Sequence, residues 1–212
     1  LGNKKSFHEL RSLGVLKNLK PNEKAFVQRL VMDTLRNLDR YDRFLKKYLK
    51  KEPKLRVKNI LRLGLTELVT GGASHAIVNE AVNYAASNKT TRPMKGLVNA
   101  VLRKLSSYKI EEWNKDGSIS RLPKWLRKPL ISAYGKKTVI EIEKIQSFTP
   151  PIDITLKDPS KIHDWAKELD GRIIFQESIR LESGKQISAL PGFKEGDWWV
   201  QDIAASIPIR LL

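Results

Sequence analysis

The chain has 212 residues, of which 41% are hydrophobic and none is cysteine, and its 40 Lys and Arg against 23 Asp and Glu give a formal net charge of +17. This apolar content is enough for a folded core, which excludes a wholly disordered chain. No apolar run approaches the roughly 18 residues of a membrane span, and the lack of cysteine excludes disulfide scaffolds, cysteine-ligated zinc, iron–sulfur clusters and thiol nucleophiles.

The positive charge is concentrated in the first half of the chain. Residues 1–110 hold 24 Lys and Arg against 8 Asp and Glu, whereas residues 111–212 hold 16 against 15. A basic region beside a nearly neutral one indicates two modules, the first of which binds a polyanion. The basic residues are spread over more than one short segment, so nucleic acid is a better match than a membrane surface. No signal-peptide pattern opens the chain, which favours a cytoplasmic location.

Four helices are predicted in the first half. Residues 23–51 place apolar side chains at a 3.6-residue spacing, and Pro53 ends this helix and opens the next. The second helix ends at Gly71. Two further helices are expected at about 77–86 and 93–107. The short connections favour antiparallel neighbours in a helical bundle.

One face of the predicted helix 23–51 carries a stripe of basic side chains. At about 100° per residue, four basic side chains lie within about 40° of Arg29, opposite the apolar face, and they are Arg36, Arg40, Arg43 and Lys47. A solvated face is one explanation, because Asp39 is spaced to pair with Arg43. The repulsion between Arg36 and Arg40 at i,i+4 favours a phosphate partner instead. A kink near residues 38–40 would divide the stripe.

Other basic residues extend this candidate RNA site. Between Lys46 and Lys58 only Glu52 opposes the positive charge. The complete predicted RNA-binding set is Arg29, Arg36, Arg40, Arg43, Lys47, Lys50, Arg103 and Lys104. If phosphates are the ligands, replacing Arg36 and Arg40 with Gln should weaken binding to all RNA sequences alike and leave folding nearly unchanged.

The second half reads as a smaller α+β unit. Residues 111–121 lack periodicity and form the candidate linker. One or two helices, broken near Gly135, follow at 125–147. Alternating apolar residues predict a strand at 152–156, then come a helix at 160–169 and strands at 172–175, 178–182 and 198–201. Residues 202–212 resemble an amphipathic helix that has not been terminated, so we interpret the chain as a piece of a longer protein.

Motifs for chemistry are missing from this sequence. The 12 glycines form no phosphate-binding loop and no glycine-rich strand–turn–helix. The three histidines lie far apart without carboxylates at ligand spacing. We therefore predict no catalytic residue, no cofactor-binding residue and no metal site in this chain.

Several segments, in the right order, resemble a known family. Residues 74–82 (SHAIVNEAV) and 95–105 (KGLVNAVLRKL) are similar to the NusB-like helical domain. Residues 122–126 (LPKWL), 150–155 (PPIDIT) and 196–202 (GDWWVQD) resemble the RsmB (Sun/Fmu) branch of rRNA cytosine-5 methyltransferases. The last segment separates this branch from NusB itself.

The resemblance implies a mainly α fold with a modular order. It comprises a NusB-like antiparallel helical bundle at 1–110, a linker at 111–121, a small α+β (ferredoxin-like) domain at 122–202, and at 203–212 the start of a helix leading into a catalytic domain absent from this chain. Trp199, Gln201 and Asp202 would then form the interface to that domain.

The implied function is that of the RNA-binding front of an enzyme. The parent would transfer a methyl from S-adenosylmethionine to a cytosine of 16S rRNA, and its partner would be small-subunit rRNA. Cytosine-5 methylation needs a cysteine thiolate, so this segment alone is expected to be inactive and to bind no cofactor.

Two other readings stay open from the sequence. The chain could be a stand-alone NusB-type transcription antitermination or RNA-binding module, or an adaptor whose basic face binds an acidic protein. A glycine-rich turn and a Pro-Cys motif encoded after Leu212 would select the methyltransferase, and a stop codon would favour the stand-alone module.

Overall fold

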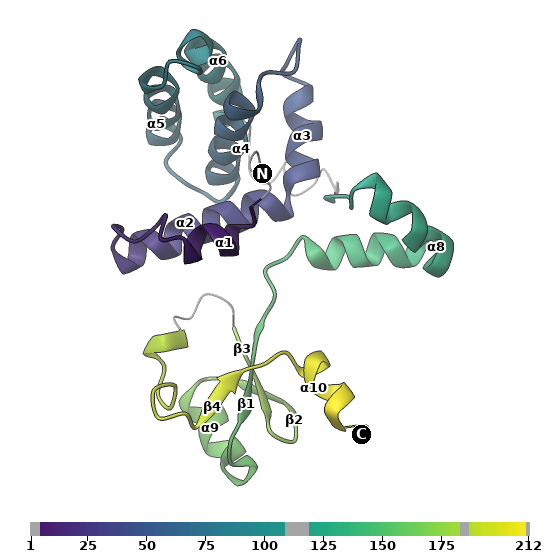
Figure 1. Cartoon of the computed structure of the whole chain (residues 1–212). Coiled ribbons are helices and arrows are strands. Elements are labelled where there is room, and N and C mark those ends of the chain that lie inside the picture. The colour runs from purple at the N-terminus through teal and green to yellow at the C-terminus, as the bar shows by residue number, and fades with distance from the viewer. Residues whose placement is uncertain (1–4, 109–118, 183–186, 211–212) are drawn as a thin grey trace. The chain divides into compact units, whose positions relative to one another are not determined.

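The structure, a computed structural model, describes residues 5–108, 119–182 and 187–210 (Figure 1). The chain forms two compact units, Leu1–Ser147 and Phe148–Leu212, and each is described by itself. The sequence predicted a second domain from residue 122, after a linker at 111–121, and residues 111–118 of that linker lie outside the described part. In the structure residues 122–147 belong to the first unit instead, because the segment that enters them is bonded to α3.

The first unit begins with three helices: α1 (Phe7–Ser12), α2 (Pro21–Arg36) and α3 (Leu38–Lys46). The prediction of one helix over residues 23–51 was wrong. Asn37 leaves helical geometry, with φ −101° and ψ 13°, and its side-chain amide donates to the carbonyl of Asp33 at 3.1 Å. The backbone N–H of Asn37 donates to the same carbonyl at 3.1 Å, and Asn37 is the one residue between α2 and α3.

The next helices complete an antiparallel bundle (Figure 1). They are α4 (Leu55–Val69), α5 (Ser74–Ser87), the 3₁₀ turn η1 (Arg92–Met94) and α6 (Lys95–Ser106). All three predicted helices are confirmed, although α5 begins earlier than expected, at Ser74. The fold class predicted for this half, a NusB-like helical bundle, is therefore observed.

A buried apolar core joins α3, α4, α5 and α6. Its largest fully buried members are Tyr41, Leu45, Val57, Leu61, Val98 and Leu102. Gly64 allows α4 and α6 to approach closely, because a Cβ at this position would lie 2.9 Å from a methyl of Leu102. A hydrogen bond of 2.8 Å between the buried hydroxyls of Thr34 and Thr66 fastens α2 to α4.

The last helix of the first unit is α8 (Lys124–Gln146). It is broken at Gly135, whose φ of 80° and ψ of 155° are not helical, as the sequence predicted. Glycine adopts positive φ without the clash that a Cβ would cause. Two helical segments therefore meet at an angle here (Figure 1).

The second unit is built on a four-stranded sheet of β1 (Ile152–Leu156), β2 (Arg172–Phe175), β3 (Ser178–Leu181) and β4 (Trp198–Val200). The order is β2-β3-β1-β4 and every neighbouring pair is antiparallel. The elements between and after the strands are η2 (Pro159–Lys161), α9 (Ile162–Glu168), η3 (Ile187–Ala189) and α10 (Ile203–Arg210). This strand order is that of a ferredoxin-like unit, as predicted, but between β3 and β4 the described residues contain only the 3₁₀ turn η3 in the place of the second helix.

The two faces of β1 differ in chemistry. Ile154 and Leu156 belong to the apolar core, together with the buried Trp198. The opposite face carries Asp153, whose carboxylate accepts two hydrogen bonds from the Arg180 guanidinium at 2.7 and 2.8 Å. The same carboxylate accepts the N–H of Ile203 at 3.4 Å, so it also fixes the first residue of α10 to the sheet.

Candidate nucleic-acid interface

The predicted arginine stripe does not lie on a single helix. Arg29 and Arg36 belong to α2, Arg40 and Arg43 to α3, and the turn at Asn37 separates the two pairs. The helical-wheel argument that placed all of them on one face assumed a continuous helix, and that assumption was wrong. The structure divides the stripe where the sequence analysis named a possible kink.

Two of these arginines are paired with carboxylates of their own helix. Arg36 contacts Asp33 at 2.9 Å, and Arg43 contacts Asp39 at 3.0 Å. Arg40 is half-buried and engaged with its neighbours. Arg29 is exposed, with its guanidinium 5.7 Å from the centre of the Phe26 ring. Most side chains of the stripe are therefore already engaged in contacts within the protein.

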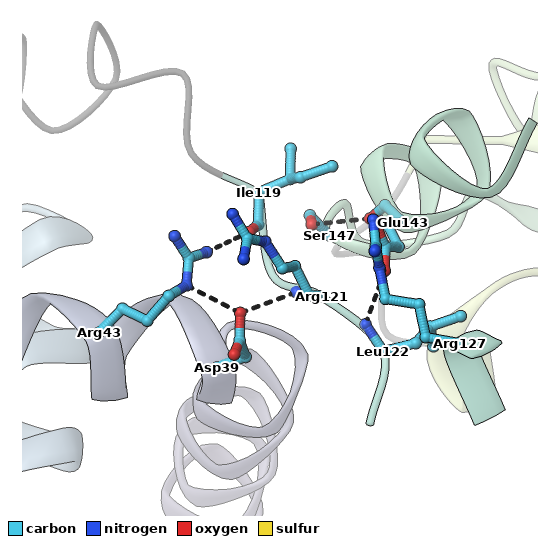
Figure 2. A network of polar contacts seen from close by, with 8 residues as sticks. All are labelled: Asp39, Arg43, Ile119, Arg121, Leu122, Arg127, Glu143 and Ser147. Carbon is cyan, nitrogen blue, oxygen red and sulfur yellow. Dashed lines mark hydrogen bonds and ion pairs between the residues drawn. The ribbon is translucent and has the colours of Figure 1, made fainter. Parts of the chain in front are cut away.

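Arg43 and Asp39 also hold the segment that leads into α8 (Figure 2). The Arg43 guanidinium donates to the carbonyl of Ile119 at 2.5 Å, and Asp39 accepts the N–H of Arg121 at 3.0 Å. These contacts join residues more than 70 positions apart in the sequence. Arg43 acts here as a structural residue, which its position in the stripe did not predict.

The segment is held a second time by Glu143 of α8 (Figure 2). This carboxylate is 1% exposed and accepts the N–H of Leu122 at 2.9 Å and the Arg127 guanidinium at 2.7 and 3.2 Å. Burial alone would raise the pKa of Glu143, but the hydrogen bonds from Arg127 and Leu122 outweigh it and hold that pKa below its usual value.

Exposed positive charge gathers in the connection between α3 and α4. We call residues 46–56 the basic segment, and its cations are Lys46, Lys47, Lys50, Lys51, Lys54 and Arg56. All six are exposed. Within the part of the chain that the structure describes, no ion pair involves any of them. Their charge is available to a ligand.

The acidic residues near the basic segment are already paired. Asp42 contacts Lys58 at 3.0 Å and the nearly buried Arg62 at 2.6 Å, and Lys58 also pairs with Glu52. Burial alone would raise the pKa of Asp42, but the hydrogen bonds from Arg62 and Lys58 lower it below its usual value. Because these carboxylates are occupied, they do not neutralise the basic segment.

A second group of cations lies at the same end of the bundle. Lys89, Arg92 and Lys95 are exposed around the connection between α5 and α6, and residues 81–110 contain no Asp or Glu. Arg56 donates to the hydroxyl of Thr90 at 3.4 Å, which brings the two connections together (Figure 1). We name the surface formed by residues 46–56 and 89–95 the basic pole.

Sequence reasoning missed the second half of the basic pole. Lys89, Arg92 and Lys95 were absent from the predicted set, although Arg103 and Lys104, which are further from the stripe in sequence, were included in it. The acid-free stretch 81–110 was the signal that could have found them. Both α4 and α6 begin at this pole without an acidic residue in their first turns, so their free N–H groups add to the positive potential.

Arg103 and Lys104 lie in the last turn of α6, away from the basic pole. Both are exposed. Arg103 borders a groove of about 440 Å³ between α5 and α6, whereas Lys104 does not. The predicted RNA-binding residues are thus distributed over three places: the α2–α3 helices, the basic pole and the last turn of α6.

In the second unit the structure brings Trp199, Gln201 and Asp202 close together. The Trp199 indole is 46% exposed and its N–H donates to the side-chain carbonyl of Gln201 at 3.0 Å. Asp202 accepts the N–H of Ala204 at 2.8 Å in the first turn of α10. Asp202 therefore has a local structural role, while Trp199 offers an apolar surface.

No metal-binding cluster is found in residues 5–108, 119–182 and 187–210. No described helix is long and apolar enough to cross a membrane. The described sheet is entirely antiparallel, and no glycine-rich turn leads from one of its strands into a helix. No step of methyl transfer is therefore assigned to these residues.

Comparison with known proteins adds independent information. Residues 2–107 match the NusB family. The chain is 29% identical over 198 residues to ribosomal RNA small subunit methyltransferase B of Escherichia coli (strain K12) and to the protein of that name from Escherichia fergusonii. Each alignment covers 86% of this chain but 46% of the relative, so the chain spans about half the length of these curated relatives.

A solved structure supports the fold. The crystal structure of PH0851 matches 99% of this chain and 52% of its own chain, with a TM-score of 0.61 and 14% sequence identity. At this identity the match concerns the fold alone. It extends over both units of the chain.

Proposed function

The chain belongs to the NusB family, and from this premise we propose that it is the RNA-binding N-terminal portion of a 16S rRNA (cytosine-5-)-methyltransferase. The parent protein would transfer a methyl from S-adenosylmethionine to small-subunit rRNA in the cytoplasm. The basic pole is the observation that carries the RNA-binding part of this proposal.

The basic pole suits a phosphate backbone in charge and in placement. It gathers nine exposed cations from two connections, and the nearby carboxylates Asp42 and Glu52 are paired with other residues. Each lysine that contacts a phosphate releases a condensed counterion, which is the main source of affinity for nucleic acid. A surface of this kind binds RNA without reading its bases.

The methyltransferase part rests on the relatives. Their alignment covers 86% of the chain, whereas the family match ends at residue 107, so the similarity extends into the residues after the helical bundle. The name of those relatives identifies ribosomal RNA of the small subunit as their substrate. Transfer of that activity to the parent of this chain is our proposal.

The second unit would connect RNA binding to catalysis. We assign Trp199, Gln201 and Asp202 to the interface with the catalytic domain. The exposed indole of Trp199 supplies apolar surface, and Asp153 fixes the start of α10 against the sheet. The direction in which the chain leaves the sheet is thereby set by a buried carboxylate.

Binding of RNA is tested directly on the 212-residue chain. Its affinity for a small-subunit rRNA fragment should fall as salt rises, with a log–log slope of about −0.7 for each phosphate contact on single strands. An acidic protein whose net negative charge is similar to that of the RNA fragment serves as the competitor. Binding to that protein without binding to RNA would favour the adaptor reading and overturn the proposal.

The parent's activity needs a separate experiment. Deletion of the gene should remove one 5-methylcytosine from small-subunit rRNA, as read by bisulfite sequencing, and a copy of the complete gene should restore it. An unchanged methylation pattern would contradict the methyltransferase proposal. RNA binding with no change in methylation would favour a stand-alone NusB-type module.

A further inference from the structure

The groove between α5 and α6 is separate from the basic pole. It is bordered by α5 and by α6 from Asn99 onward, and its lining residues are Ser74, His75, Val78, Asn79, Val82, Asn99, Arg103, Ser106 and Ser107. Its volume of about 440 Å³ is in the range of sites that hold small ligands. None of these lining residues, all from the described part of the chain, carries a carboxylate.

The polar side chains of the groove divide into two kinds. Ser106 and Ser107 donate to carbonyls of α6, at 2.9 and 2.8 Å. In contrast, within the described residues no hydrogen bond or ion pair uses the side chains of the other five polar lining residues, which are Ser74, His75, Asn79, Asn99 and Arg103. Five polar side chains without a partner in the described part of the chain therefore border one concave surface.

These groups match the parts of a nucleotide. The side-chain amides of Asn79 and Asn99 each offer a donor and an acceptor, which is the pattern needed to bind the edge of a base. Val78 and Val82 supply apolar surface for the face of a base. Arg103 supplies a cation that can bind a phosphate in bidentate fashion.

We propose that this groove holds one unstacked nucleotide of a single-stranded RNA, with its base against Asn79 and Asn99 and its phosphate on Arg103. This assignment rests on the proposed RNA-binding function and deepens it. The basic pole contributes affinity without sequence preference, whereas the groove contributes a preference for a base. A duplex cannot enter, because its bases are paired and stacked.

The chain offers a matched pair of substitutions for the test. Asn79 and Asn83 are both exposed on α5, but only Asn79 lines the groove. Fluorescence anisotropy would measure binding of the full chain to labelled oligoadenylate, oligocytidylate and oligouridylate of about a dozen nucleotides. Asn79→Ala should weaken binding of the preferred oligonucleotide about 2- to 12-fold. The salt slope should stay unchanged, and Asn83→Ala should bind as the unsubstituted chain does.

A duplex RNA provides the second control. Asn79→Ala should bind it with unchanged affinity, because the duplex uses phosphate contacts only. Crosslinking with 4-thiouridine in the single strand should label peptides 74–79 or 99–107 in addition to the basic pole. Circular dichroism would confirm that both variants fold.

The outcomes separate the groove from the proposed function. Suppose that the unsubstituted chain binds RNA, that Asn79→Ala binds each of the three single strands as tightly as the unsubstituted chain does, and that crosslinks are confined to residues 46–56 and 89–95. The groove assignment is then wrong, and the RNA-binding proposal stands. If the unsubstituted chain binds none of these RNAs, the proposed function fails and the groove assignment fails with it.

Discussion

The arginines of α2 and α3 and the lysines of the basic pole have the same sign of charge but different environments. Arg36 and Arg43 each have a carboxylate three or four residues away on their own helix, and Arg43 also holds Ile119. The lysines of residues 46–54 have no such partner within the described part of the chain. A count of cations therefore overstates the charge that a ligand can use.

The largest expected effect is on RNA affinity at the basic pole. Replacing Lys50, Lys51 and Lys54 together with Gln should remove three phosphate contacts, which lowers affinity about 100-fold at 0.1 M salt and makes the log–log slope shallower by about 2. Stability should change little, because all three side chains are exposed.

A control with the same loss of charge is available in the second unit. Replacing the exposed Lys157, Lys161 and Lys167 with Gln should leave RNA affinity and its salt slope nearly unchanged. Equal losses in both triple variants would show that net charge, and not the basic pole, determines binding.

The next largest effect is on stability, at a cation that is paired with a carboxylate within the protein. Arg62→Met should lower the free energy of unfolding by about 2 kcal/mol, because it removes the two guanidinium hydrogen bonds to Asp42 while Lys58 remains as a partner. Urea denaturation would measure this. Arg56→Met, at an exposed position of the same helix, should keep stability and weaken RNA binding. The reverse pattern would contradict the division into structural and ligand-binding cations.

A smaller effect is expected from acid. The pKa of Glu143 is lowered in the folded chain, so its contribution to stability is complete above the pKa of the unfolded chain and is lost as pH falls through the folded value. Glu143→Gln should therefore be less stable at neutral pH, and the difference should shrink below about pH 4. Thermal denaturation across this range gives the test. A constant difference at every pH would show that the charge of Glu143 is irrelevant.

The smallest effect is expected within the α2–α3 stripe. Arg36→Gln should change the salt slope for RNA by well under the 0.7 of one phosphate contact, because Asp33 already pairs with this arginine. Lys50→Gln, the single substitution at the pole, should change it by about 0.7. Equal slopes for the two variants would restore the stripe as the RNA site.

Most of the fold was accessible from the sequence. Proline and glycine fixed the limits of α4, positive φ at Gly135 broke α8 where expected, and alternation identified β1 with its observed bounds. The sequence predicted one continuous helix through Asn37, with a kink near residues 38–40 named only as a condition, because the apolar spacing continues across this residue. The helix ends at Asn37, whose backbone N–H and side-chain amide both donate to the carbonyl of Asp33, and periodicity carries no information about the side-chain bond.

The candidate site was less accessible, for a geometric reason. Whether a cation is free depends on where the carboxylates lie in space. Asp42 accepts a hydrogen bond from Arg62, which lies 20 positions away in the sequence, and Arg56 donates one to Thr90, which lies 34 positions away. Helical spacing predicted the Asp39–Arg43 pair, because both residues lie on one helix. It could not predict pairs formed between helices.

The hydrogen bond from Leu122 to Glu143 also provides a spectroscopic probe. An amide that donates to a carboxylate experiences the charge of that group directly, and the charge is lost on protonation. The amide resonance of Leu122 in a nitrogen–proton correlation spectrum should therefore move with pH along the titration curve of Glu143. A single backbone signal would report the ionisation of a side chain that is 1% exposed to solvent and lies 21 positions later in the chain.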